Sequence, residues 1–374
     1  MNELGIYIHI PFCKQKCYYC DFVSYQNKND LIEEYIQKVK KEINSYEFEK
    51  YNITTIYIGG GTPSYIDSSY IVQIIETIKE KIKKNKTKFG DIEITIEINP
   101  GTVNEEKLEN YKKVGINRLS IGLQSTQNNL LKQIGRIHTY EQFEKTYYMA
   151  KKVGFNNINV DLMIGLPNQT IKDIKITVDK ILKLEPTHIS TYSLIIEEGT
   201  KIEKLIRENK IKLPEEEKER QMYWYVKNIL ELNGYYHYEI SNFAKRKKES
   251  KHNMNCWEQK EYIGIGAAAH SYLNKIRYAN LEKIEEYILE NKHVIFEQQK
   301  LEDMKKEYMM LGLRKIDGIE ISKFKQKYGE NPVFLYREEL ENLVNEGLIV
   351  VDGDRIRLTN KGIDFANLVW EKFV

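Results

Sequence analysis

The sequence of 374 residues predicts an α/β protein whose main part is a partial, TIM-like (β/α)6 barrel. Three observations predict this fold. Short β-rich runs alternate with longer amphipathic stretches, glycine- and proline-containing loops follow several of the runs, and the pattern changes to longer helices after about residue 200. Alternating strands and helices favour parallel strands joined by right-handed crossovers. A composition of 41% hydrophobic and 30% charged residues is that of a globular chain.

Six runs rich in β-branched residues are the predicted strands. They lie at residues 4–10, 54–58, 92–98, 118–121, 157–162 and 188–194. Between the first two, residues 31–48 repeat apolar side chains at i, i+3 and i+4, which predicts an amphipathic helix. Six strand–helix units are too few to close an eight-stranded barrel, but they suit an open, partial one.

Loops after these runs indicate where a functional site lies. GGGTP at 59–63, NPG at 99–101 and GLP at 165–167 each follow a predicted strand, and three cysteines follow the first strand. Barrels of this type assemble their sites at the carboxyl ends of the strands. We therefore expect one rim to carry the site.

Two further regions follow the barrel, which we expect to span residues 1–200. Residues 201–300 are expected to form a helical connection that also binds substrate, and residues 301–374 a winged-helix-like α+β domain. The predicted elements of that domain are helices at 303–313, 320–328 and 332–346 and a hairpin at 348–358 that turns at Asp352 and Gly353.

Charge and hydropathy restrict the partners and the compartment. The chain has 57 Lys and Arg against 55 Asp and Glu, a net charge of +2. A net charge this small does not attract the protein to nucleic acid or membranes. The basic run at 245–248 is typical of a solvated loop, because no base-reading residues accompany it. No apolar run of about 18 residues and no secretion signal is visible. We expect a cytoplasmic protein without an integral membrane segment, in which thiols stay reduced.

Three cysteines lie within eight positions of an otherwise cysteine-poor chain. The spacing Cys13-x3-Cys17-x2-Cys20 predicts three thiolate ligands for an iron–sulfur cluster. Three thiolates on four irons leave one iron open to a small chelating molecule. A zinc site with His9 or Cys256 as fourth ligand is the alternative, although zinc motifs usually pair their ligands more regularly.

The cysteine motif resembles the signature of the radical SAM superfamily. Further segments are similar to oxygen-independent coproporphyrinogen III oxidases and to HemW-type heme chaperones. They are IYIHIPFC (6–13), GGGTPS (59–64), EINPGT (97–102), RLSIGLQS (118–125), GRIHT (135–139), DLMIGLPNQT (161–170), YEISNFA (238–244) and GIGAAAHS (264–271). The resemblance implies a radical SAM barrel with a [4Fe–4S] cluster on Cys13, Cys17 and Cys20. It also implies S-adenosylmethionine (SAM) bound at the open iron.

Glycines after the second strand are the first candidate SAM contacts. Residues 59–61 let backbone N–H groups approach a ligand, although a tight turn would also require glycine. By the resemblance, Gly60, Gly61 and Thr62 meet the methionine part of SAM.

Polar residues in later motifs complete the expected SAM site. Glu97 ends an apolar strand, where a carboxylate is costly to bury without a partner. The resemblance implies SAM contacts for Glu97, Gln124, Arg136 and Asp161, and Arg136 could pair with the SAM carboxylate. A structural salt bridge is the alternative for each of them.

Two tyrosines flank the cysteine motif. Tyr7 and Tyr19 resemble family residues that pack near the cluster and the adenine. Aromatic core packing would explain both nearly as well.

A second resemblance concerns heme. His252 and Asn253 begin a segment similar to the HNxxY heme-binding motif of HemW proteins, but Cys256 stands where the motif has tyrosine. A neutral histidine in an exposed loop can ligate heme, and so can a thiolate; an ordinary surface histidine is the alternative. His270 follows three alanines, which could admit a flat ligand or simply pack in the core.

Two features favour a heme chaperone over an oxidase. Phe22 stands where the oxidases carry a fourth cysteine, and twelve residues precede Cys13, where the oxidases have a long extension. The resemblance therefore implies a protein that binds heme and delivers it to an apo-hemoprotein acceptor. The alternative is an enzyme of porphyrin biosynthesis that converts coproporphyrinogen III to protoporphyrinogen IX. A winged-helix nucleic-acid binder is a distant third reading. The oligomeric state is left open, with a homodimer as one option.

Overall fold

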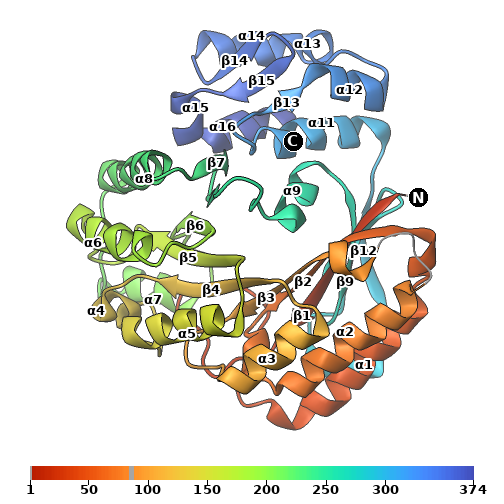
Figure 1. Ribbon diagram of the computed structural model, residues 1–374. Helices are drawn as coiled ribbons and strands as arrows, with labels where there is room; N and C mark the ends of the chain where they lie inside the picture. The colour runs from red at the N-terminus through yellow and green to blue at the C-terminus, as the bar shows by residue number, and fades with distance from the viewer. Residues whose placement is uncertain (1, 84–87) are drawn as a thin grey trace.

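The computed structural model describes residues 2–83 and 88–374, and its centre is one large curved sheet (Figure 1). The order of its twelve strands is β12-β11-β10-β9-β1-β2-β3-β4-β5-β6-β8-β7. The parallel strands are β1 Glu3–Ile10, β2 Asn52–Gly60, β3 Glu93–Ile98, β4 Arg118–Gln124, β5 Ile158–Ile164 and β6 His188–Ser193. The predicted partial (β/α)6 barrel is confirmed.

Helices cover the outer face of the parallel strands (Figure 1). They are α1 Ile32–Ser45, α2 Ser68–Ile82, α3 Glu105–Val114, α4 Asn128–Gln133, α5 Tyr140–Val153 and α6 Ile171–Leu182. α1 buries Tyr35, Ile36, Val39 and Ile43, the stripe that its periodicity predicts. The main apolar core lies between these helices and the sheet.

The inner face of the barrel, here called the lumen, is polar. Directly paired residues of neighbouring strands point to the same face, and Glu97 of β3 pairs with Ser120 of β4. Asn159 of β5 donates to Ser120 at 2.8 Å and to Asp161 at 2.7 Å, and its side-chain oxygen lies 2.6 Å from the His188 ring. Closed eight-stranded barrels fill this space with layers of branched apolar residues. Here hydrogen bonds organise it instead.

Residues 201–300 differ from the expected helical connection. They contain α7 Lys201–Arg207, α8 Glu216–Leu232, α9 Lys251–Trp257 and α10 Ile284–Leu289, and also β7 Tyr236–Glu239, β8 Asn242–Ala244, β9 Glu261–Ile265, β10 His270–Leu273, β11 Ile276–Asn280 and β12 His293–Gln298. β8 pairs with β6 and β9 with β1, so the region extends the sheet at both sides. The helical expectation is wrong because strands of three to six residues leave little periodicity beside a helix of 17 residues.

The C-terminal part has its own small sheet and its own core. Its elements are α11 Leu301–Gly312, α12 Ile321–Tyr328, α13 Pro332–Leu335, α14 Arg337–Asn345, α15 Asn360–Asp364 and α16 Ala366–Trp370, with strands β13 Ile319–Glu320, β14 Ile349–Asp352 and β15 Arg355–Leu358. The predicted hairpin turns at Gly353 with a φ of 57°. Phe324, Leu340 and Ile356 belong to a second apolar cluster, apart from the main one.

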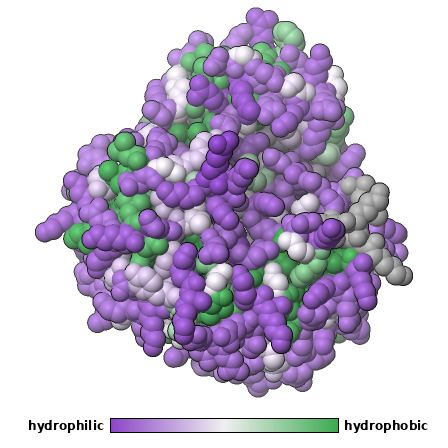
Figure 2. All heavy atoms as spheres, viewed as in Figure 1, coloured by the Kyte–Doolittle hydropathy of each residue, from purple (hydrophilic) through white to green (hydrophobic). Residues whose placement is uncertain are grey.

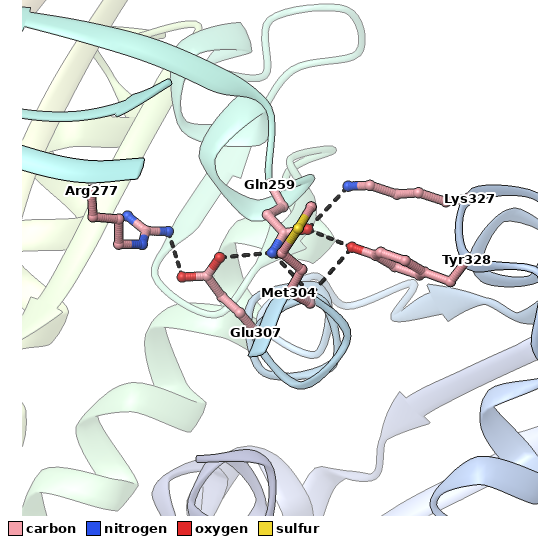
Figure 3. A network of polar contacts seen from close by, with 6 residues as sticks. All are labelled: Gln259, Arg277, Met304, Glu307, Lys327 and Tyr328. Carbon is pink, nitrogen blue, oxygen red and sulfur yellow. Dashed lines mark hydrogen bonds and ion pairs between the residues drawn. The ribbon is translucent and has the colours of Figure 1, made fainter. Parts of the chain in front are cut away.

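A polar network joins this C-terminal part to the sheet. Figure 3 shows Arg277 of β11 paired with Glu307 of α11. The buried Gln259 donates to the Glu307 carboxylate at 2.7 Å. Its side-chain oxygen accepts from the Tyr328 hydroxyl at 2.6 Å and from Lys327 at 3.0 Å. One amide side chain therefore links the segment after α9 to α11 and α12.

Arg314 forms a second link between the two parts. Its guanidinium lies 4.3 Å from the ring centre of Trp257 on α9 and 4.7 Å from that of Trp370 on α16. Glu239 of β7 is fully buried, and burial raises the pKa of its carboxyl while Arg314 partly lowers it. Arg314 is therefore the nearby positive charge that partly offsets the burial of the Glu239 carboxyl.

Among the described residues, no helix combines the length and the apolar character needed to cross a bilayer. Hydrophilic residues cover most of the face drawn in Figure 2, with hydrophobic residues in separate patches.

Candidate functional site

A cavity of about 500 Å³ lies at the carboxyl ends of the parallel strands. Its volume falls in the range of roughly 300–1,000 Å³ that is usual for small-molecule sites. The predicted site residues that line it are Cys13, Cys17, Tyr19, Cys20, Gly60, Gly61, Thr62, Glu97, Gln124, Arg136 and Asp161. Tyr7 and His252 do not line it. The structure thus brings together residues that lie up to 148 positions apart, from Cys13 to Asp161.

The cysteine loop is tied to the ends of β1 and β2. The Cys13 N–H donates to the Tyr25 carbonyl at 2.9 Å, and the Cys13 sulfur lies 3.4 Å from the Thr62 hydroxyl. Burial raises the pKa of the Cys13 thiol, and the Thr62 contact partly opposes this. Burial also raises the pKa of Cys20 to about 11. A bound metal would supply the positive charge that these thiolates need.

The donor set fits a cluster better than a single ion. All three cysteines are free thiols that line one cavity. In the described part of the chain, no three His, Cys, Asp or Glu side chains converge on one point where a metal ion could sit. A cubane cluster needs no such convergence, because each thiolate binds a different iron. His9 and Cys256, the candidate fourth ligands for zinc, do not line the cavity.

The glycines after β2 are required by their neighbours. Gly60 has a φ of 112°, and a Cβ there would lie 2.6 Å from the His9 ring. A Cβ on Gly61 would lie 3.0 Å from the Cys13 sulfur. The turn therefore packs directly against the cysteine loop, while the Gly60 N–H donates to the Glu97 carboxylate at 3.2 Å.

Glu97 is a half-buried carboxylate that lines the cavity. It accepts from the Tyr57 hydroxyl at 2.9 Å as well as from Gly60. Burial raises the pKa of Glu97 to about 7; the Tyr57 bond opposes this rise, and the nearby Asp161 adds to it. Burial likewise raises the pKa of Asp161. Two poorly solvated carboxylates favour a cationic ligand group between them.

Arg136 holds the opposite side of the cavity. Its Nη1 donates to Asn99 at 2.9 Å and to the Cys17 sulfur at 3.8 Å, and its Nη2 donates to the Gly122 carbonyl at 3.0 Å. Burial would lower the pKa of Arg136, but Tyr19 and Cys17 outweigh it, so the net pKa is raised. Its Nε is buried without a hydrogen-bond partner in the described structure.

Gln124 ends β4 in a strained conformation. Its φ is 69°, in the left-handed region that residues other than glycine rarely adopt, and the pairing with β5 shifts register there. Such strain is typical of positions held in place for function.

Several residues that line the cavity are not among those predicted from the sequence. Asn99 joins Arg136 to Thr62, to which it donates at 2.8 Å. It lies in the NPG loop that the sequence places at the rim, but Asn99 itself is not among the predicted site residues. Tyr57 and Ser120 alternate with buried strand residues, and Tyr192 follows on β6. Polar residues that alternate with apolar ones along a strand indicate the face that points into the lumen. Only the pairing of the strands in the structure shows that these residues reach the cavity.

Tyr7 belongs to the packing beneath the cavity. Its hydroxyl lies 3.0 Å from Nδ1 of His9, and its ring stacks on Tyr57 with centres 6.3 Å apart. Burial raises its pKa. Tyr7 is therefore part of the aromatic packing, whereas Tyr19 lines the cavity.

His252 corrects the sequence-based expectation of an exposed loop. It lies on α9, is 8% exposed, and its Nδ1 lies 2.9 Å from the Thr55 hydroxyl. Burial, followed by the charge of Arg118, lowers the pKa of His252 to about 4. The segment is helical because the Ser250 side chain caps it by accepting from the Asn253 N–H. The His252 ring is therefore neutral and enclosed.

A Glu97→Gln variant should be more stable than the wild type at pH 8 but hardly so at pH 5. An acid whose pKa rises on folding destabilises the fold as pH increases from its ordinary value of 4.5 through about 7. The rise corresponds to about 3 kcal/mol at pH 8. Urea denaturation of cluster-free protein measures it, with the exposed Glu76→Gln as control. An equal gain at both pH values would contradict this assignment.

Comparisons with known proteins agree over the whole chain. The radical SAM superfamily profile matches residues 7–181, and the HemN C-terminal domain profile matches residues 300–365. The heme chaperone HemW of Lactococcus lactis is 40% identical over 98% of this chain and 96% of its own length. The heme chaperone HemW of Bacillus subtilis is 36% identical over 98% of both chains.

A solved structure shares the fold. Coproporphyrinogen III oxidase (HemN) from Escherichia coli superposes with a TM-score of 0.85. The match covers 100% of this chain and 90% of the oxidase at 22% identity. At this identity the match establishes a shared fold and nothing about function. Full-length identity to the chaperones, together with both family profiles, decides the relationship: the chain belongs to the HemW family of the radical SAM superfamily.

Proposed function

We propose that the protein binds heme and delivers it to an apo-hemoprotein, with a [4Fe–4S] cluster and SAM in support. The observation that carries the proposal is the 40% identity to a heme chaperone over nearly the full length of both proteins. The four free cysteines suit a reducing compartment, so we place the protein in the cytoplasm.

Residues of the cavity have separate roles in this proposal. Cys13, Cys17 and Cys20 would hold the cluster, whose open iron would bind the amino and carboxylate groups of SAM. When reduced, such a cluster supplies the electron that cleaves the SAM sulfonium. Glu97 and Asp161 offer negative charge to the cationic part of SAM, and Arg136 offers positive charge to its carboxylate.

His252, the heme ligand that the sequence motif predicts, would need a conformational step. Its ring is stacked on Tyr57 with centres 5.1 Å apart and is bonded to Thr55. The imidazole would reach a heme only if α9 released it from both partners. Cys256 is on the same helix, and burial raises the pKa of its thiol to about 11.

An anaerobic heme titration tests the proposed function. Cluster-reconstituted protein should bind heme stoichiometrically, seen in the Soret band, and should then lose it to an added apo-hemoprotein with a distinct spectrum. Protein that binds no heme, or keeps it in the presence of the acceptor, would refute the chaperone. Conversion of coproporphyrinogen III with SAM under the same conditions would instead establish the oxidase alternative.

A further inference from the structure

Most histidines of the chain are unavailable to an external ligand. A heme axial ligand must expose an imidazole nitrogen that has no other partner. The histidines that are buried and hydrogen-bonded are His9, His138, His188, His237 and His252. His293 is exposed, but it pairs with Asn280 on the face of the sheet opposite His270, and its Nδ1 lies 2.7 Å from the Asn280 side-chain oxygen. The His270 ring is exposed and forms no hydrogen bond within the described structure.

The inner face of the barrel continues to His270. Tyr7 pairs with Gly264 of β9, and Tyr262, two residues earlier on that strand, pairs with Tyr272 of β10. Paired residues share a face, and side chains alternate along a strand, so His270 faces the same side as Tyr272 and Tyr7. β10 runs antiparallel to β9, so His270, its first residue, lies toward the strand ends that carry the cysteines.

Apolar side chains surround His270 on this face. Its ring stacks on Phe296 of β12 with centres 5.2 Å apart and planes inclined by 4°. His270 pairs with Ala279, which pairs with Val294, so a small residue separates the imidazole from a second apolar side chain. Phe296 is 58% exposed and Val294 is 46% exposed, on the edge strand of the sheet. Exposed apolar residues on an edge strand are a hazard unless a ligand or partner covers them.

We propose that heme docks on this surface, with His270 as axial ligand of the iron and with Phe296 and Val294 against the porphyrin. The inference rests on the proposed function, since heme is the flat, apolar, imidazole-binding molecule that this function supplies. A shallow site also suits delivery, because an acceptor can reach heme that is not enclosed in a pocket. The site requires no movement of α9, unlike His252.

A comparison of single variants in the full, cluster-reconstituted protein tests the site. His270→Ala should weaken heme binding at least tenfold and remove the spectrum of a histidine-ligated iron, and added imidazole should restore that spectrum. Phe296→Ser should weaken binding while the ligation spectrum remains. His293→Ala is the matched control, an exposed histidine on β12 that should bind heme like the wild type.

The outcomes separate this inference from the proposed function. Absence of heme binding in the wild type would overturn both. Normal binding and spectrum in His270→Ala, with loss in His252→Ala, would overturn the His270 site and leave the chaperone intact. Failure of imidazole to restore the spectrum of His270→Ala would also overturn it. So would a heme-free wild-type dimer that Phe296→Ser converts to monomer, since a second copy would then cover the surface.

Discussion

A Cys17→Ala variant should retain almost none of the iron and visible absorption that the anaerobically reconstituted wild type holds. Two thiolates would remain for a cluster that needs three from this chain. The loss would also leave the half-buried Arg136 without the sulfur that faces its Nη1 at 3.8 Å. Iron and sulfide content, together with the absorption spectrum, measure the effect.

Cys256→Ala is the matched control for this experiment. Cys256 lies on α9 and does not line the cavity, so its removal should leave the iron content unchanged. Equal loss of iron in both variants would mean that four cysteines share one metal site.

Arg314→Leu should lower the free energy of unfolding by about 1–3 kcal/mol, because the buried Glu239 carboxyl would lose the positive charge that partly offsets its desolvation. Glu239 is fully buried, and Arg314 is the positive group that lowers its pKa. The variant would also remove the cation between Trp257 and Trp370. Urea denaturation followed by circular dichroism gives the change.

A second substitution tests whether the unpaired charge of Glu239 causes the loss of stability in Arg314→Leu. Glu239→Gln removes the buried charge, so Arg314→Leu should cost less in a Glu239→Gln background than in the wild type. Arg337→Leu is a suitable control, because that arginine forms an exposed pair with Glu341 worth no more than about 1 kcal/mol. Identical costs in both backgrounds would show that the tryptophan contacts, and not Glu239, explain the effect.

The parallel core of the fold could be predicted because each strand is flanked by a long helix and a glycine- or proline-containing loop. Residues 4–10 and 92–98 lie within one residue of the observed β1 and β3. The four strands β9 to β12, which form one side of the sheet, could not be predicted in the same way. β9 to β12 are short runs that carry polar residues such as tyrosine, histidine and glutamate, and only pairing with β1 makes them a sheet.

The cavity could be predicted in part because carboxyl ends of parallel strands meet at one rim. This rule places the cysteine loop, Gly61 and Glu97 together. It cannot identify Asn99, whose role depends on where Arg136 reaches from another loop. Nor can it reveal that His252 is enclosed, because Thr55 and Tyr57 meet it from a strand about 200 positions away.

The polar lumen places the residues that stabilise the fold and the residues that line the cavity at different strand positions. On each parallel strand, one side chain packs against the helices and the next one faces the hydrogen-bonded interior. Folding stability therefore resides mainly on one set of alternate positions, and chemistry on the other. Substitutions that retune the cavity can accumulate without eroding the apolar core, so one scaffold can diverge into proteins that handle different molecules.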